Sequence, residues 1–229
     1  MRKLFSLFIL LGFVAIGLQA QQTVYVQGVP RQLPTVQKMT RSIDAAPLDT
    51  SKIQYYVGEG SKTSVLIIQW NDGKGAEKLV WGYRWEDETT ATGESMIRAI
   101  AKADPRFFVL VYGETQYGAA IGGFGFDLNG NNSAGLINIA NDSTKTDANE
   151  NGLIHTSAYD FDNYIGADST DHWRSGWYSN GFWSYYTADN LTSQPGFSGV
   201  GATGRKLKDG SVDYWTFATF GGPSAPEVT

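Results

Sequence analysis

The sequence predicts an α+β domain of β-grasp-like architecture, with a mainly antiparallel sheet, one helix packed across it and a long loop insertion. Three observations predict this fold class. Apolar residues alternate with period two beside a turn at residues 71–73, only one stretch (92–103) has sustained helical spacing, and a strand at 212–217 follows the turn signal Asp209-Gly210. The order hairpin, helix, strands and closing strand is typical of a sheet covered by one helix.

The first hairpin is predicted at residues 65–85. An apolar run at 65–70 leads into Asn71-Asp72-Gly73, whose residue types favour a turn. Beyond the turn, large apolar residues occupy every second position, at Leu79, Trp81, Tyr83 and Trp85. This period is that of a strand with one buried face.

The helix is predicted to begin after Thr92, whose hydroxyl is suited to capping, with Glu94 near the positive end of the helix dipole. It ends at Asp104-Pro105, because the residue before a proline avoids helical dihedral angles. Its apolar face consists of Met96, Ile97, Ile100 and Ala103. A strand at 107–112 and a glycine-rich strand or strand pair at 117–128 follow, and a polar region at 129–171 predicts long loops.

An aromatic ribbon is predicted at residues 173–190, because Asn180-Gly181 is a strong signal for a two-residue hairpin turn. One face of such a hairpin would cover the core, and the other face would offer rings to a flat or ring-shaped ligand. A ribbon buried on both faces is the structural alternative. The candidate ligand-binding residues are Trp173, Trp177, Phe182, Trp183, Tyr186, Trp81 and Trp85, with Trp215 as a further contributor.

The N-terminal sequence predicts export. Residues 1–20 have the charged, apolar and small-residue order of a signal peptide, residues 21–52 form a proline-containing leader or linker with one edge strand at 23–26, residues 53–220 form the domain, and residues 221–229 form a flexible tail. No other apolar stretch has membrane length, so no integral membrane segment is expected after cleavage. The protein is therefore expected in the periplasm, at the cell surface or secreted.

Composition excludes several kinds of function. A net charge of −5 argues against a nucleic-acid-binding surface, and the absence of cysteine excludes disulfides, thiolate metal sites and a Cys nucleophile. With two histidines and no Gly-x-Ser-x-Gly or Walker motif, an enzyme is not expected. The abundant carboxylates leave a glycosidase as a minor alternative.

A calcium loop is a further candidate. Asp147, Asn149 and Asn151, followed by Gly152, match the first half of such a loop, although Ala158 stands where the bidentate carboxylate belongs. A complete EF-hand is therefore excluded, and Asp160 or Asp162 would have to complete the site. Asp127, Asn129 and Asn131 form a second cluster of the same kind. A solvated asparagine-rich loop explains both clusters equally well.

Four segments resemble the secreted β-grasp-like domain related to the C-terminal part of transcobalamin and intrinsic factor. They are TGESMIRAIAKA (92–103), GFGFDLNG (123–130), GFWSYYTADN (181–190) and VGATGRKLKDGSVDYWTF (200–217). Ser211 stands where that family usually has an acid, and the 131–171 insertion is longer than the family pattern. The segment WGYRW (81–85) is also similar to one in uncharacterised secreted proteins of Bacteroidetes.

These resemblances imply a binding role, and the first implies a corrinoid, with cobalamin as the most specific ligand. The leading hypothesis is a non-enzymatic secreted or surface protein that captures a bulky ring-containing molecule, for which an outer-membrane uptake system is the expected partner. The alternative hypothesis is a glycan-binding or adhesive module that stacks its rings on sugars and uses calcium.

Overall fold

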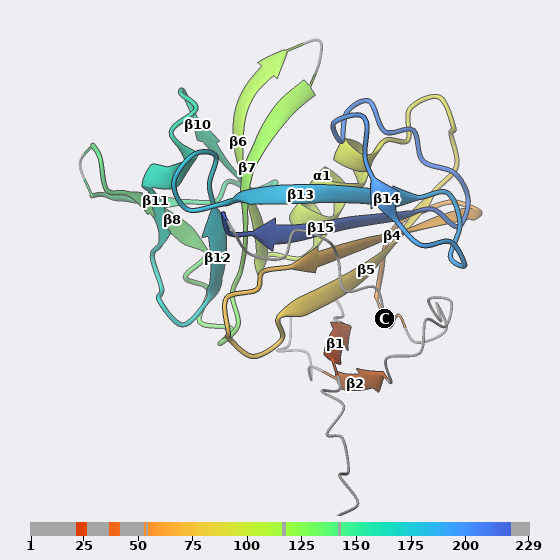
Figure 1. The fold of residues 1–229 in the computed structure, drawn as a ribbon, viewed down its shortest axis with the longest axis horizontal. Helices are drawn as coiled ribbons and strands as arrows, with labels where there is room; N and C mark the ends of the chain where they lie inside the picture. The colour runs from red at the N-terminus through yellow and green to blue at the C-terminus, as the bar shows by residue number, and fades with distance from the viewer. Residues whose placement is uncertain are drawn as a thin grey trace, which may run out of the picture.

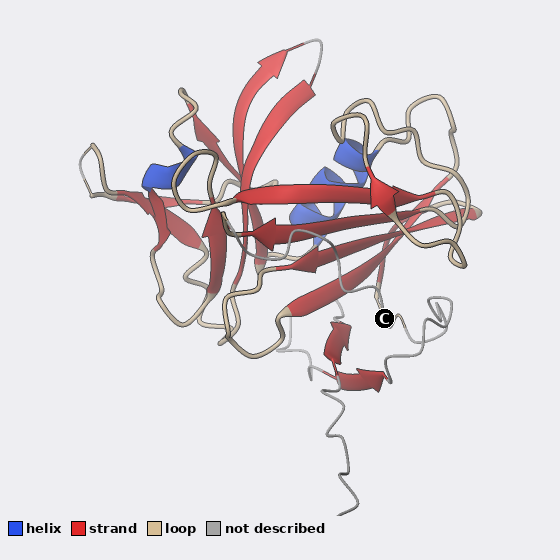
Figure 2. Ribbon diagram, viewed as in Figure 1, coloured by secondary structure: helices blue, strands red, loops and turns tan. Residues whose placement is uncertain are grey.

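The computed structural model describes residues 22–26, 37–41, 53, 55–115, 118–141 and 143–220. These residues are mostly β-sheet with one α-helix, in mixed sheets that are rich in antiparallel pairs, so the α+β class is confirmed (Figure 2). The predicted signal peptide (1–20), the predicted tail (221–229) and most of the predicted leader (21–52) lie outside the described residues. In the described part, no helix is both long enough and apolar enough to cross a membrane.

A large sheet forms the centre of the molecule, with strand order β14-β13-β15-β4-β5-β1-β2 and with β3 also paired to β5 (Figure 1). Its strands are β1 (Gln22–Val26), β2 (Gln37–Arg41), β3 (Tyr56–Gly58), β4 (Lys62–Gln69), β5 (Lys78–Trp85), β13 (Phe182–Ala188), β14 (Gly196–Phe197) and β15 (Val212–Ala218). The antiparallel pair β4–β5 confirms the predicted first hairpin. β1 lies between β5 and β2, so the prediction of an edge strand at 23–26 is wrong in its position.

The closing strand β15 lies between β13 and β4, antiparallel to the first and parallel to the second. All seven of its residues are buried. The sequence predicted a hairpin around Asp209-Gly210, but β15 has no partner immediately before that turn among the described strands. A central position gives β15 two strand partners and two covered faces, which buries more apolar surface than an edge hairpin would.

The single described helix, α1 (Gly93–Ala103), confirms the predicted start and end. The Thr92 hydroxyl accepts from the Ser95 N–H at 3.1 Å, and the Ser95 hydroxyl accepts from the Thr92 N–H at 2.8 Å, which completes a capping box. Met96, Ile97 and Ile100 are buried against the large sheet, as the helical spacing predicted.

Two smaller sheets complete the fold. The second sheet has the order β10-β6-β7-β12, and its long strands β6 and β7 rise steeply from the large sheet in Figure 1. The third has the order β11-β8-β9. The strands are β6 (Phe107–Thr115), β7 (Gly118–Phe126), β8 (Gly135–Asn138), β9 (Lys145–Asp147), β10 (Leu153–Thr156), β11 (Tyr164–Gly166) and β12 (His172–Ser175), with a 3-10 helix η2 (Phe161–Asn163).

The region from 131 to 171 therefore holds four strands where the polar sequence predicted long loops. The strands are three or four residues long, and only a few of their apolar side chains, including Leu136 and Ile154, face inward. Strands this short carry too few apolar positions for a period of two to stand out.

The main core lies between the large sheet, α1 and the second sheet. Trp81 and Trp85, both predicted as ligand-binding, are buried there with 0% and 3% of their surface exposed. The Trp81 indole donates to Asp104 Oδ2 at 3.2 Å, and the Trp85 indole donates to Ser64 Oγ at 2.9 Å. Both indoles are thus used by the fold and lie beyond the reach of a ligand at the surface.

Candidate functional site

The predicted hairpin at Asn180-Gly181 is wrong. Residues 172–175 form β12, which pairs with β7 of the second sheet, whereas residues 182–188 form β13, which pairs with β15 and β14 of the large sheet. The chain between them passes from one sheet to the other. The two halves of the predicted ribbon therefore belong to different sheets, and the candidate site is a hollow lined by β13 and by the chain that joins β12 to β13.

This hollow, the aromatic pocket, has a volume of about 430 Å³. It is lined by Ala119, Ala120, Ile121, Gly176, Trp177, Phe182, Trp183, Gly201, Ala202 and Trp215. Its walls come from β7, β13, β15, the 176–181 loop and a strap that we define as residues 196–206. Volume and lining match those of small-molecule pockets, which are concave and mostly apolar.

Small residues create the space and large rings give it its shape. Five of the ten lining residues are glycine or alanine, so the β7 wall and the strap project little into the hollow. Trp183 meets Phe124 edge to face at a centroid distance of 4.9 Å, and its indole donates to the Arg174 carbonyl at 3.1 Å. Trp215 stacks on Tyr185 at 4.2 Å. The rings of the pocket are therefore held in fixed orientations before any ligand arrives.

The Asp162 carboxylate holds the 176–181 loop. It accepts from the backbone N–H groups of Trp177, Tyr178, Ser179 and Asn180 at 2.8 to 3.2 Å. Burial alone would raise the pKa of Asp162, but these four donors together bring that pKa below its usual value. One carboxylate thus fixes the position of Trp177, which remains 45% exposed at the pocket rim.

The strap is attached to the first turn of α1. The Gly93 N–H donates to the Arg205 carbonyl at 2.9 Å, and the Glu94 N–H donates to the Ala202 carbonyl at 3.0 Å. These bonds use two of the N–H groups that a helix start leaves unpaired. The Thr203 hydroxyl also donates to the Glu94 carboxylate. Ala202, a pocket residue, is therefore anchored by the helix.

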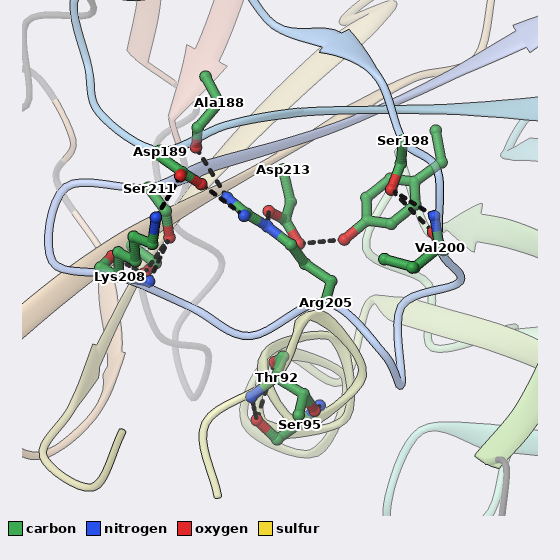
Figure 3. Close-up of polar contacts among 12 residues, drawn as sticks. Thr92, Ser95, Ala188, Asp189, Ser198, Val200, Arg205, Lys208, Ser211 and Asp213 are labelled. Carbon is green, nitrogen blue, oxygen red and sulfur yellow. Dashed lines mark hydrogen bonds and ion pairs between the residues drawn. The ribbon is translucent and has the colours of Figure 1, made fainter. Parts of the chain in front are cut away.

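An ion-pair network joins the strap to β13 and β15, with Asp213 buried and Asp189 about half exposed (Figure 3). Arg205 lies between Asp213 and Asp189, donating to their carboxylates at 3.2 and 2.6 Å. The Tyr185 hydroxyl donates to Asp213, which is fully buried. Burial raises the pKa of Asp213 to about 6, although the hydrogen bond from Tyr185 and the Arg205 charge oppose the rise. The network links β13, β15 and the strap beside the pocket.

The structure separates the predicted ligand-binding residues into four groups. Trp177, Phe182 and Trp183 line the aromatic pocket together with Trp215. Trp173 lies outside it, stacked on Phe108 at 5.7 Å, and Tyr186 packs on the opposite side of the large sheet near Phe197. Trp81 and Trp85 belong to the core. The glycine-rich strand predicted at 117–128 contributes Ala119, Ala120 and Ile121 to the pocket lining.

Two features of the pocket had no expected role in the sequence. The sequence indicated no role for Asp162 in holding the aromatic residues, because its four hydrogen bonds to the 177–180 backbone join positions more than a dozen residues apart. The strap carries no aromatic or charged motif at Gly201 and Ala202, so its place at the pocket follows only from its attachment to α1.

The predicted calcium residues serve the local fold. The Asn149 side-chain oxygen accepts from the N–H groups of Asn151 and Leu153 at 2.9 and 3.1 Å, and an Asp147 oxygen is paired with Lys145 at 2.7 Å. Within the described ranges, no three His, Cys, Asp or Glu residues form a group that could hold a metal ion. Calcium binding at Asp147, Asn149 and Asn151 stays a prediction.

The second cluster predicted for calcium is internally hydrogen-bonded as well. The Asp127 carboxylate accepts from the N–H groups of Gly130 and Asn132 at 2.6 and 2.9 Å. The Asn129 and Asn131 side chains both donate to Asp168 Oδ2, at 3.0 and 2.8 Å. These contacts fold the 127–133 loop onto the segment before β12.

Comparison of the chain with protein-family models, with curated proteins and with solved structures finds no match. The function proposed below therefore depends on the geometry of the pocket and on the resemblance of the four short segments.

Proposed function

We propose that this protein is a non-enzymatic, extracytoplasmic binding protein that takes a ring of a small molecule into the aromatic pocket. The observation that carries the proposal is the convergence of Trp177, Trp183 and Trp215, with Phe182, on one hollow of about 430 Å³. Aromatic walls bind flat or ring-shaped ligands through large contact areas at a small cost in side-chain entropy. The fixed orientations of the Trp183 and Trp215 rings reduce that cost further.

The Trp215 indole supports a ligand with a hydrogen-bond acceptor. Its Nε1–H is one of three side-chain polar atoms in the described residues that are buried and have no hydrogen-bond partner. A buried donor without an acceptor costs about 1–3 kcal/mol. A ligand with an oxygen or nitrogen would recover this energy if its entry brings that atom to Nε1, and a purely apolar ligand would not.

Cobalamin is the most specific ligand that we propose. The sheet order β5-β4-β15-β13, with β15 parallel to β4 and α1 across the sheet, supports a β-grasp-like assignment and with it the resemblance to the transcobalamin-related domain. A ligand of that size would place one edge in the pocket and rest against the exposed rings of Trp177 and Tyr178. A secreted or surface location and an outer-membrane uptake partner belong to the same proposal.

A glycan-binding module is the second candidate, and an aromatic surface beside the pocket favours it. Tyr159, Trp177 and Tyr178 are 52%, 45% and 71% exposed, and the centroid of Trp177 lies 6.0 Å from Tyr159 and 6.4 Å from Tyr178. Adjacent exposed rings of this kind stack on the faces of pyranose rings. The Asp162 carboxylate binds the backbone N–H groups of two of the three residues, Trp177 and Tyr178.

Titration of the protein lacking residues 1–20 tests both candidates. Tryptophan fluorescence and calorimetry would be recorded against cyanocobalamin, and then against a glycan panel with calcium or with a chelator. Saturable cyanocobalamin binding supports the first candidate, and glycan binding without a response to corrinoids supports the second. No response to either ligand class contradicts both.

The variant Trp177→Ala locates the site. Because Trp177 is at the rim and half exposed, its removal is expected to weaken binding at least about tenfold and to leave the melting temperature close to that of the wild type. Phe197→Ala is the matched control, since Phe197 is 71% exposed and lies outside the pocket. Equal affinity of the two variants would place the ligand elsewhere.

A further inference from the structure

A second hollow, the edge groove, lies along β12 and has a volume of about 370 Å³. Among the described strands, β12 pairs with β7 alone, so its other edge is free to line a groove. The opposite wall is β11, residues 164–166. Lys74, Asp168, Asp171, Trp173 and Arg174 also line it. None of these residues belongs to the aromatic pocket.

The two carboxylates of the edge groove already have donors. Asp171 accepts from the Leu128 N–H at 3.0 Å and from the Ser133 hydroxyl at 3.3 Å. Asp168 accepts from Thr170 and from the side-chain amides of the 127–133 loop. Protein donors therefore already occupy most of the hydrogen-bond acceptor positions of both carboxylates, and few remain for a ligand.

The two cations of the edge groove, Arg174 and Lys74, have fewer hydrogen-bond and ion-pair partners than the carboxylates. Arg174 has no carboxylate partner among the described residues; one terminal nitrogen donates to the Asn71 carbonyl at 3.2 Å, and its buried Nε–H has no acceptor. The guanidinium lies 5.4 Å from the Phe217 ring centroid. The Lys74 ammonium donates to the Asp171 carbonyl and lies 4.0 Å from Asp72, a carboxylate that also binds His172.

We propose that the edge groove binds a small carboxylate-bearing molecule, with Arg174 as its main recognition residue and Lys74 as a second cation. The planar guanidinium matches a carboxylate through two parallel N–H···O bonds. The half-buried Trp173 ring provides an apolar wall, which favours a carboxylate carried on a ring, as in a sugar acid.

Nuclear magnetic resonance provides the direct test, because the arginine Nε–H signals are resolved from backbone amides. Titration of the ¹⁵N-labelled protein with D-glucuronate is expected to shift the Arg174 Nε–H signal to saturation. D-glucose and the methyl ester of glucuronate, which have the ring without the charge, are expected to leave it unchanged. Absence of a saturable shift, or equal shifts with the ester, would overturn the proposal. An equal response to sulfate would also overturn the preference for carboxylates.

Variants separate recognition by Arg174 from a change in folding. Arg174→Gln is expected to weaken glucuronate binding at least about tenfold, and Arg174→Lys to restore only part of it. Arg84→Gln is the matched control, because Arg84 also lies over a ring, that of Tyr56 at 4.9 Å, but does not line the groove. Unchanged affinity in Arg174→Gln would overturn the proposal. Melting temperatures of all three variants verify that each is folded.

The edge groove and the aromatic pocket are tested independently. Trp177→Ala is expected to leave glucuronate binding unchanged, and Arg174→Gln is expected to leave ring-ligand binding unchanged. Failure of the proposed function therefore leaves the edge-groove proposal standing, and the reverse also holds.

Discussion

A single carboxylate, that of Asp162, determines where the aromatic side chains at the pocket rim lie. Its four backbone donors give the 176–181 loop one conformation, although that loop belongs to no strand. Trp177 and Tyr178 are thereby held in solvent-exposed positions that hydrophobic burial alone would not favour. Pre-ordered rings reduce the entropy lost on binding, so Asp162 contributes to affinity without touching a ligand.

Asp213 is the residue with the strongest consequence for pH dependence. Its carboxylate is buried, receives hydrogen bonds from Tyr185 and Arg205, and still has its pKa raised to about 6. Because the folded-state pKa lies above the unfolded value of 3.8, the stability contributed by this group is fully present below about pH 4 and is lost as the pH rises through about 6.

We expect Asp213→Asn to remove this dependence. The difference in unfolding free energy between wild type and variant should change by about 2 kcal/mol between pH 4 and pH 7, in the direction that disfavours the wild type at pH 7. Urea unfolding at pH 4, 5, 6 and 7 measures it. A difference that stays constant across this range would contradict the raised pKa of Asp213.

At the scale of elements, packing between strands depends on glycines at close contacts. Gly122 on β7 faces the ring of Phe161 in η2, and a Cβ atom added there would lie 2.3 Å from that ring. Gly75, in the turn between β4 and β5, has open space around it and is exposed. The two positions form a matched pair for the same substitution.

Gly122→Ala is expected to destabilise the protein by about 1–3 kcal/mol, because the ring or the strand must move. Gly75→Ala is expected to be neutral or to stabilise by up to about 1 kcal/mol, because alanine restricts the unfolded chain. Thermal unfolding of both variants gives the comparison. Equal melting temperatures for Gly122→Ala and Gly75→Ala would show that β7 and η2 can move apart to accept the added methyl group at little cost.

The elements that could be predicted from the sequence are those whose signals are local. Thr92 and Ser95 cap α1 within one turn, and the alternation in β5 ends at a turn only a few residues away, so each was found. Asn180-Gly181 is an equally strong local turn signal, but no hairpin forms there. Its backbone binds Asp162, which is 18 residues away from Asn180. The parallel pairs β4–β15 and β6–β10 leave no local signal. Of the candidate site, the rings could be predicted from the sequence, but not that β12 and β13 belong to different sheets.

At the scale of the whole molecule, the aromatic pocket exists only because the large sheet and the second sheet share one core. β7 lines it from one side and β13 and β15 from the other, and Phe124 of β7 contacts both Trp183 and Trp215. The core that joins the sheets includes Trp70, Trp81 and Trp85. Separation of the sheets would therefore remove the pocket and expose the core together.

We accordingly expect one cooperative unfolding transition. Tryptophan fluorescence, far-ultraviolet circular dichroism and ring-ligand binding should be lost at the same denaturant concentration. Ligand binding that disappears well before the circular dichroism changes would show that the sheets come apart while each remains folded. The glucuronate response of the edge groove provides an independent probe within the second sheet.

The strap has a consequence for how such a protein diversifies. Its attachment to α1 uses two backbone carbonyls and the Thr203 hydroxyl, and a methyl group at Gly196, Gly199 or Gly201 would meet no neighbour within 4 Å. A side chain at Gly201 would change the lining of the pocket while the scaffold beneath keeps its shape. Descendants of one ancestral chain could thus come to accept different molecules through changes in this short segment alone.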